Sequence, residues 1–349
     1  MSDNLVRDSA ARLFADLVPP AVVNAAEAGT WPVELWDAAA EAGFPDALAA
    51  VAEAPGDLSG ISDAAAILRE AGRRAAPIPL AESMLARWLL AGAGIDAPEG
   101  PLTIAPVDRQ STFTVKRDGK GARISGRAAG VPWAQAAAGI VVCAEGQVAL
   151  IPPRQADIRA GESLAGEPRD DISIDAVVEA RPAPAGVDAA LVYRLGALTR
   201  CVMSAGALDE VLKLSVQYAN DRVQFGRPIG KFQAIQQQLS ILAENVAASG
   251  VIADAAVEAA AGKGDLAFFV AVAKSRIGEA AGKVAEIAHQ VHGAIGFTHE
   301  HRLHHLTRRL WSWRDEFGVE SEWSIELGRL AAAKGADALW PLLTASREA

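Results

Sequence analysis

Cysteine is scarce in this chain, and its scarcity excludes one class of fold. The 349 residues contain only two cysteines, Cys143 and Cys201, which lie far apart in the sequence. Two such residues cannot form the dense disulfide framework of small secreted proteins, and they fit a reducing compartment. The beginning of the chain lacks the continuous apolar stretch of a signal peptide, and no run approaches a membrane span. We therefore expect a cytoplasmic protein with no membrane partner.

Runs of lysine and arginine are also missing, and the formal net charge is −10. Nucleic-acid backbones attract proteins through clustered positive charge, so we expect no nucleic-acid partner. Internal repeats and low-complexity tails are absent as well. Hydrophobic residues make up 51% of the 349 positions, which is enough for a substantial core. A chain of this length exceeds a single ordinary domain, so two or three packed units are expected.

The spacing at which apolar residues recur changes twice along the chain. Residues 1–100 carry helix start and stop signals, such as Thr30 before Trp31 and Pro32. Residues 101–183 alternate between apolar and polar side chains, as in the DISIDAVV run that begins at Asp171, which predicts strands. Residues 184–349 carry long apolar stripes at helical spacing, which predict an antiparallel bundle. We expect these three segments to be three domains of a mainly helical α+β protein.

A helix pattern ends near Arg222, directly before an FGRPIG segment at Phe225–Gly230. Gly226 and Pro228 in that segment end one helix and let another begin. At such a corner, the planar fork of an arginine can pair bidentately with a diphosphate, and a neighbouring aromatic ring can cover an apolar ring edge. The competing interpretation is an arginine that caps a helix and a phenylalanine that belongs to the core.

The combination of Arg222, the FGRPIG segment and the pair Phe232 and Gln233 resembles the acyl-CoA dehydrogenases. A second segment, QVHGAIGF at Gln290–Phe297, resembles the Q-x-x-G-G-x-G loop of that family, with alanine in place of the second glycine. Glycines let a backbone approach a ligand closely, and a glutamine amide can hydrogen-bond to phosphate or ribose. Taken alone, this segment would be a helix C-cap. The order of helical, β and helical segments is also that of the family.

The resemblance implies an N-terminal helical domain, a small middle β-barrel-like domain and a C-terminal four-helix bundle. It also implies FAD as the cofactor, with the ADP half gripped by residues of a neighbouring subunit. The residues that the resemblance assigns to this grip are Arg222, Phe225, Gln233, Gln290, Val291, His292, Gly293 and Ala294.

The chemistry that the resemblance implies is α,β-desaturation of an acyl-CoA thioester with hydride transfer to flavin N5. This chemistry requires a carboxylate that removes the α-proton. Counting from Gln290 places Phe317 at the family's base position, and the alternative position used by some members falls on Gly196. A shift of one residue would make Glu316 the base, and Glu320 is a second candidate. The competing interpretation is a solvated acidic stretch that contains Asp315, Glu316, Glu320 and Glu322.

The β segment departs from the family too. The segments that hold the flavin ring have no clear counterparts, and the nearest match places Val131, Pro132 and Trp133 there. Proline cannot donate a hydrogen bond to the ring, whereas Trp133 could stack on it or belong to the core. The short N-terminal half and the missing glutamate at the base position resemble one subunit of the heterotetrameric bacterial enzymes that act on steroid-type side chains. This resemblance implies an acyl-CoA substrate, a homo- or hetero-tetramer and an electron-transfer flavoprotein as acceptor; the alternative is a non-catalytic assembly or regulatory subunit.

All six histidines lie within seventeen positions, from His289 to His305. His301 and His305 are four residues apart and could share one face of a helix, so a metal site has to be considered. No carboxylate or cysteine completes a familiar ligand pattern. We therefore expect solvated or interface histidines and no metal.

Overall fold

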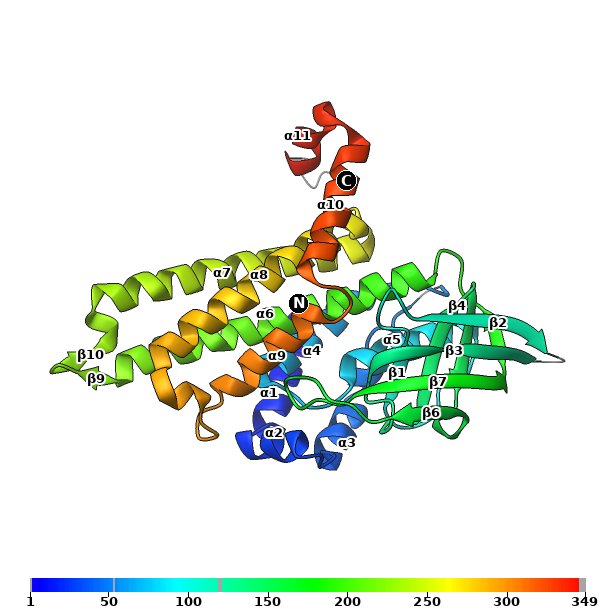
Figure 1. Ribbon diagram of the computed structural model, residues 1–349, viewed down its shortest axis with the longest axis horizontal. Coiled ribbons are helices and arrows are strands. Elements are labelled where there is room, and N and C mark those ends of the chain that lie inside the picture. The colour runs from blue at the N-terminus through cyan, green and yellow to red at the C-terminus, as the bar shows by residue number, and fades with distance from the viewer. Residues whose placement is uncertain (1, 53, 119–120, 345–349) are drawn as a thin grey trace.

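The computed structural model describes residues 2–52, 54–118 and 121–344 (Figure 1). Helices form its N-terminal part, and α4 shows why: its buried side chains, such as Ile61 and Leu68, recur along one face that packs on the core. Gly94, with a φ of 67°, ends the last of these helices. The helices are α1 (Ser2–Leu17), α2 (Pro20–Glu27), α3 (Val33–Glu41), α4 (Ile61–Arg74) and α5 (Leu80–Ala93).

Strands follow between Leu102 and Pro182. In the described residues they form two four-stranded sheets, with the orders β1-β4-β5-β8 and β2-β3-β7-β6. Only the β1–β4 pair is parallel within these two sheets. The strands are β1 (Leu102–Ala105), β2 (Thr112–Asp118), β3 (Gly121–Pro132), β4 (Gly139–Ala144), β5 (Gln147–Ile151), β6 (Ala156–Arg159), β7 (Arg169–Val178) and β8 (Ala180–Pro182).

The two sheets enclose a core of their own, which corrects the expected barrel shape. Ile140 and Val142 of β4 meet Ile124 of β3 and Ile172 of β7 in this core. The alternate β4 residues, Val141 and Cys143, join the larger helical core instead. Because the sheets stay separate and face each other, the β segment is a sandwich and not a closed barrel.

The C-terminal part is a helical bundle built on a very long helix, α6. Asp188 caps α6 by accepting a hydrogen bond of 2.7 Å from the Leu191 backbone N–H. Gly72 of α4 and Gly206 of α6 let these two helices approach closely, since a Cβ at either glycine would collide with the backbone of the other helix. The helices are α6 (Ala189–Asp221), α7 (Gln233–Glu258), α8 (Leu266–His292), α9 (Leu303–Asp315), α10 (Glu320–Lys334) and α11 (Ala336–Thr344).

One described helical span, Gln233–Lys263, is long and apolar enough to cross a membrane by length and composition alone, with a mean hydropathy of 1.3. The expectation that no run approaches a membrane span is therefore wrong for this helix. In the structure, α7 packs against α6 and α8, and Leu242 and Val246 lie in the shared core. Only part of the apolar surface of α7 therefore packs in the bundle interior, and Val251 is 68% exposed.

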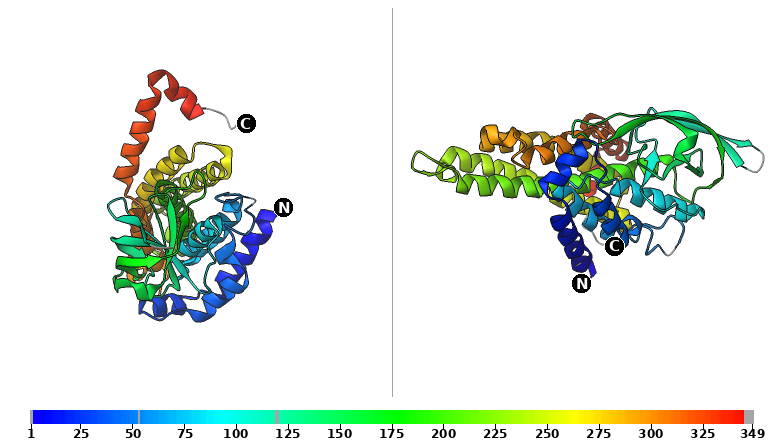
Figure 2. Two further views of the ribbon diagram at one scale, coloured as in Figure 1. Left: turned by 90° about the vertical axis from the view of Figure 1, so that its right-hand side faces the viewer. Right: turned by 90° about the horizontal axis from the view of Figure 1, so that it is seen from below.

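The bundle and the β sandwich lie at opposite ends of the long axis, and helices α10 and α11 extend away from the body (Figures 1 and 2). The N-terminal helices lie beside both. This arrangement gives the predicted α+β fold with a helical N-terminal part, a β part and a C-terminal bundle. The exact domain boundaries at residues 100 and 183 stay a prediction.

Candidate cofactor and catalytic site

The corner between α6 and α7 is a tight hairpin. Strands β9 (Val223–Gln224) and β10 (Arg227–Pro228) pair in an antiparallel manner, and the two residues between them have positive φ angles, 53° at Phe225 and 81° at Gly226. Positive φ at both central positions is typical of a type I′ turn, which matches the twist of paired strands. The turn leaves Phe225 92% exposed, so this ring is not part of the core.

Arg222 lies at the base of this hairpin. Its backbone ends α6 through a hydrogen bond from its N–H to the Tyr218 carbonyl, and its own carbonyl accepts one of 2.8 Å from Ile229. Its side chain is exposed and, within the described part of the chain, makes no hydrogen bond or ion pair. Gln233, the first residue of α7, is also exposed. An exposed guanidinium and an exposed amide on the same corner are groups that can bind an anion with hydroxyl groups, such as a nucleotide.

The Gln290 segment lies beside this corner, at the end of α8. Tyr218, one turn before Arg222, stacks on His292 with ring centroids 4.6 Å apart. Gly293 has a φ of 63°, and Ala294 is not among the residues with positive φ, so alanine is tolerated there. The structure therefore brings the two predicted cofactor segments together at one end of the bundle.

The residues of the Gln290 segment differ in exposure. Gln290, Gly293 and Ala294 are exposed, whereas the side chains of Val291 and His292 are buried. Only the backbone of these two residues could approach a ligand. The cofactor role of the whole segment stays a prediction.

Glu316, the candidate base, lies between two arginines. One carboxylate oxygen is 2.6 Å from Nη2 of Arg169, and the other is 2.6 Å from Nε of Arg200. The side chain of Glu316 is 16% exposed, so the interpretation as a solvated residue is wrong here. Asp315 and Glu322 are exposed as that interpretation expects. Glu320 pairs with Arg314 at 2.6 Å.

These ion pairs are part of a longer chain of alternating charges that sequence reasoning missed. The chain runs from α5 through α6 and β7 to α9 and α2, and each carboxylate after Glu82 lies between guanidinium groups. In order, its members are Glu82, Arg200, Glu316, Arg169, Glu167, Arg309 and Glu27. Because charges alternate, each buried ion has a compensating neighbour. The network therefore fills the space between the N-terminal helices, the β sandwich and the bundle.

This environment sets the pKa of Glu316. Burial by itself raises the pKa of its carboxyl, but the charges and hydrogen bonds of Arg169 and Arg200 outweigh burial and hold the pKa below its ordinary value. The Glu316 backbone carbonyl also accepts a hydrogen bond of 2.7 Å from Nζ of Lys274. A general base works best with a pKa near the operating pH, so the environment of Glu316 favours a structural role. Its assignment as base stays a prediction.

The resemblance assigns a catalytic base either to position 317 or to position 196. Phe317 stands at the first position, and its ring fills the space beside the second. Its ring lies against Gly196 of α6, and a Cβ added to Gly196 would lie only 2.2 Å from Cε1 of Phe317. Tyr193 meets the same ring at 5.8 Å in an edge-on contact, and Trp323 donates a hydrogen bond of 2.9 Å to the Phe317 carbonyl. No carboxylate can occupy either position while this ring fills it.

A cavity of about 450 Å³ is lined by Phe317 and by Pro132 of β3. This is the region where the resemblance expects a flavin ring. Trp133, the residue that could stack on such a ring, is buried and lies under the guanidinium of Arg169 at 4.9 Å. Trp133 is therefore a core residue, as the competing interpretation expects.

The histidines do not follow the expectation of solvated side chains. In the described residues, four of the six are buried: His289, His292, His304 and His305. Glu27, far away in sequence, supplies the carboxylate that the sequence pattern lacked, since its side chain lies 3.0 Å from Nδ1 of His305.

Comparisons with known proteins agree with this geometry. The profile of a family described as "Acyl-CoA dehydrogenase, C-terminal domain" matches residues 193–314. The chain is similar to the acyl-CoA dehydrogenase IpdE2 of Mycolicibacterium smegmatis, with 28% identity over 311 residues that cover 86% of this chain and 89% of that protein.

Two solved structures share the fold. A variant of the Tcur3481–Tcur3483 steroid ACAD has a TM-score of 0.84 and 24% identity, and the match covers 95% of this chain and 98% of that one. The ChsE4–ChsE5 complex from Mycobacterium tuberculosis has a TM-score of 0.83 and 23% identity, with 96% and 98% covered.

Proposed function

The chain belongs to the acyl-CoA dehydrogenase family, and on that premise we propose that it is an FAD-clamping subunit of a heteromeric acyl-CoA dehydrogenase. Its partner is a related chain that supplies the flavin-ring pocket and the catalytic base. A chain of the ChsE4–ChsE5 complex has this fold, and that complex is named for two different proteins. We place this assembly in the cytoplasm, with an acyl-CoA substrate and an electron-transfer flavoprotein as acceptor.

The observation that carries this proposal is the distance along α6 between Arg222 and the contact of Gly196 with Phe317. Arg222 ends α6, whereas Gly196 and Phe317 lie near its beginning. At 1.5 Å per residue, these places are roughly 40 Å apart along the helix axis. We call Arg222, Phe225, Gln233 and the Gln290 segment the clamp. The clamp therefore binds an FAD whose flavin ring does not lie at Phe317, which fits a flavin ring bound in a neighbouring chain.

Each exposed group of the clamp has a distinct task in this proposal. The Arg222 guanidinium pairs with the diphosphate, and Phe225 covers the edge of the adenine ring. The amides of Gln233 and Gln290 hydrogen-bond to ribose or phosphate oxygens. Bound FAD would supply the hydride acceptor for α,β-desaturation of the acyl-CoA.

The ion-pair network supports the division of labour. Arg200, Glu316 and Glu82 are joined where the helices meet the sandwich, so charged side chains occupy the interior beside Phe317. A subunit that keeps an exposed clamp but has a filled base position needs a partner for chemistry. The alternative is a non-catalytic assembly subunit. It differs from the proposed function in its cofactor, because such a subunit would not retain flavin.

Arg222→Ala tests the proposal in the complex of this chain with its partner. A charge-assisted bidentate contact contributes about 1.5 to 3 kcal/mol, so FAD affinity should fall about 10- to 100-fold. Flavin absorbance after gel filtration measures the retained cofactor. Arg329→Ala, which removes an exposed arginine of α10, is the matched control and should retain FAD. Unchanged FAD affinity in Arg222→Ala would reject the clamp, and a complex without flavin would favour the assembly subunit.

A further inference from the structure

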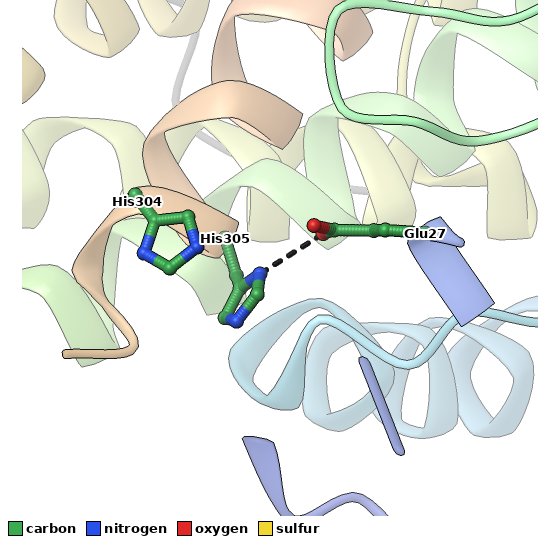
Figure 3. A group of neighbouring side chains, drawn as sticks. All are labelled: Glu27, His304 and His305. Atoms are coloured by element: carbon green, nitrogen blue, oxygen red, sulfur yellow. Dashed lines mark hydrogen bonds and ion pairs between the residues drawn. The ribbon is translucent and has the colours of Figure 1, made fainter. Parts of the chain in front are cut away.

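We propose that Glu27, His304 and His305 bind one divalent transition-metal ion of the Zn²⁺ type, which links α2 to α9. Glu27 is the last residue of α2, and the two histidines lie in the first turn of α9. One ligand atom from each of the three side chains lies within 4.8 Å of the others. Figure 3 shows the His305 ring directed at the Glu27 carboxylate and the His304 ring beside it.

The hydrogen bonds of His304 leave one ring nitrogen free for a metal. Its Nδ1 lies 2.8 Å from the His301 carbonyl, which can only accept, so Nδ1 carries the proton. Its Nε2 then presents a lone pair, and this atom is buried without a hydrogen-bond partner in the described residues. A metal-bound histidine commonly donates its other ring N–H to a carbonyl or carboxylate in this way.

The spacing of the other two ligand atoms also suits a metal. Nδ1 of His305 lies 3.0 Å from Oε1 of Glu27. Two ligands of a tetrahedral zinc ion, each at about 2.0 to 2.1 Å, are about 3.3 Å apart. An ion can therefore replace the shared proton between this nitrogen and oxygen with only small shifts. His304 and His305 are 7% and 2% exposed, so they are not surface groups that bind metals loosely.

The charge state of the ligands is suitable as well. Burial raises the pKa of Glu27, but the His305 hydrogen bond and the charge of Arg309 outweigh burial and lower the pKa to about 2. Burial lowers the pKa of His304, which disfavours the charged form of this ring. An ionised carboxylate and a neutral imidazole are the forms that bind metals.

Two cations compete for the same carboxylate, and they limit the affinity. Nη1 of Arg309 is 2.7 Å and Nη1 of Arg308 is 3.1 Å from the Glu27 oxygens. Glu167 offsets the first of these charges through its contact of 3.1 Å with Arg309. The site should therefore bind more weakly than a structural zinc site without nearby arginines.

The donor set selects the class of metal. Two imidazole nitrogens and one carboxylate oxygen suit Zn²⁺ and Co²⁺, whereas Mg²⁺ and Ca²⁺ prefer oxygen ligands. Glu27 also lines a cavity of about 270 Å³, whereas the two histidines do not. Because the site is buried between two helices, the bound ion would act mainly as a structural link.

Titration of the 349-residue chain without an affinity tag tests the site, with Co²⁺ absorption and Zn²⁺ competition as readouts. We expect one saturable ion per chain. His304→Ala removes a ligand and should weaken binding by at least about 100-fold. His299→Ala is the control, because its ring is exposed and lies 5.4 Å from that of His304, and it should bind as the parent does.

A gain-of-affinity variant covers the case in which His304→Ala does not fold. Arg308→Gln removes a half-exposed competing cation and should strengthen binding about two- to fivefold. Zn²⁺ should also raise the unfolding temperature of the parent and of Arg308→Gln. Absence of saturable binding, parent-like binding by His304→Ala, or no change of affinity in Arg308→Gln would each overturn the proposal.

Discussion

Glu316 is held between Arg169 and Arg200, and this environment decides what the residue can do. A carboxylate paired with two buried guanidinium groups stabilises the fold and loses basicity at the same time, since both arginines favour its charged form. Arg200 is only 2% exposed and also contacts Glu82. Removing the charge of Glu316 leaves both arginines with less compensation in the interior.

We therefore expect Glu316→Gln to lower the free energy of unfolding by about 3 kcal/mol, the low end of the range for a broken buried ion pair. Glu82 and Glu167 still compensate Arg200 and Arg169 in the variant, so the loss should not reach the upper end. Urea unfolding followed by circular dichroism measures the change. Asp315→Asn is the matched control, because this neighbouring acid is 64% exposed and should change the stability by less than about 1 kcal/mol.

The same variant separates the two roles of Glu316. If Glu316→Gln keeps the stability of the parent but loses about 100-fold or more in activity, then Glu316 is the base after all. The sequence could not have revealed this network. Arg169 and Glu316 are separated by 147 positions, and no local pattern records which distant charges meet in the fold.

At the scale of elements, α6 depends on small residues where other segments press against it. Gly196 faces the ring of Phe317, and Gly206 faces the backbone of α4. Apolar spacing in the sequence predicted this helix and its end near Arg222. It could not predict the sandwich, because sheet pairing joins strands such as β3 and β7 that are distant in the chain. It also could not show that Phe317 folds back onto Gly196.

Gly196→Ala should destabilise the chain by about 1 to 3 kcal/mol, because the new methyl group overpacks the contact with Phe317. Thermal or urea unfolding checks this value. Gly328→Ala is the control, since a Cβ at this helical glycine of α10 meets nothing within 4 Å and should be neutral or stabilising. In the double variant Gly196→Ala/Phe317→Ala, the two losses should not add. Additive losses would show that the two residues do not press on each other.

At the scale of the whole molecule, several exposed apolar side chains lie on the hairpin and on the Gln290 segment. Phe225 and Val223 are exposed on the hairpin, and Phe297 is 65% exposed just after the Gln290 segment. Tyr218 and His292 hold these two segments side by side. A motif reading of the sequence predicted both segments, because glycine, proline and arginine mark such corners locally. It could not establish which surface a partner covers, since that depends on how separate segments meet.

We expect the chain to assemble through this end of the bundle, because exposed aromatic rings at one place favour burial against another subunit. Light scattering should show a dimer or tetramer at micromolar concentration, and co-expression with a related partner chain should give a heterotetramer. Phe297→Ser should shift the complex to smaller species. Leu164→Ser should not, although Leu164 is 61% exposed, because it lies in the loop between β6 and β7. A stable monomer would contradict any assembly, and a homotetramer that holds one FAD per chain and dehydrogenates an acyl-CoA unaided would contradict the heteromeric form.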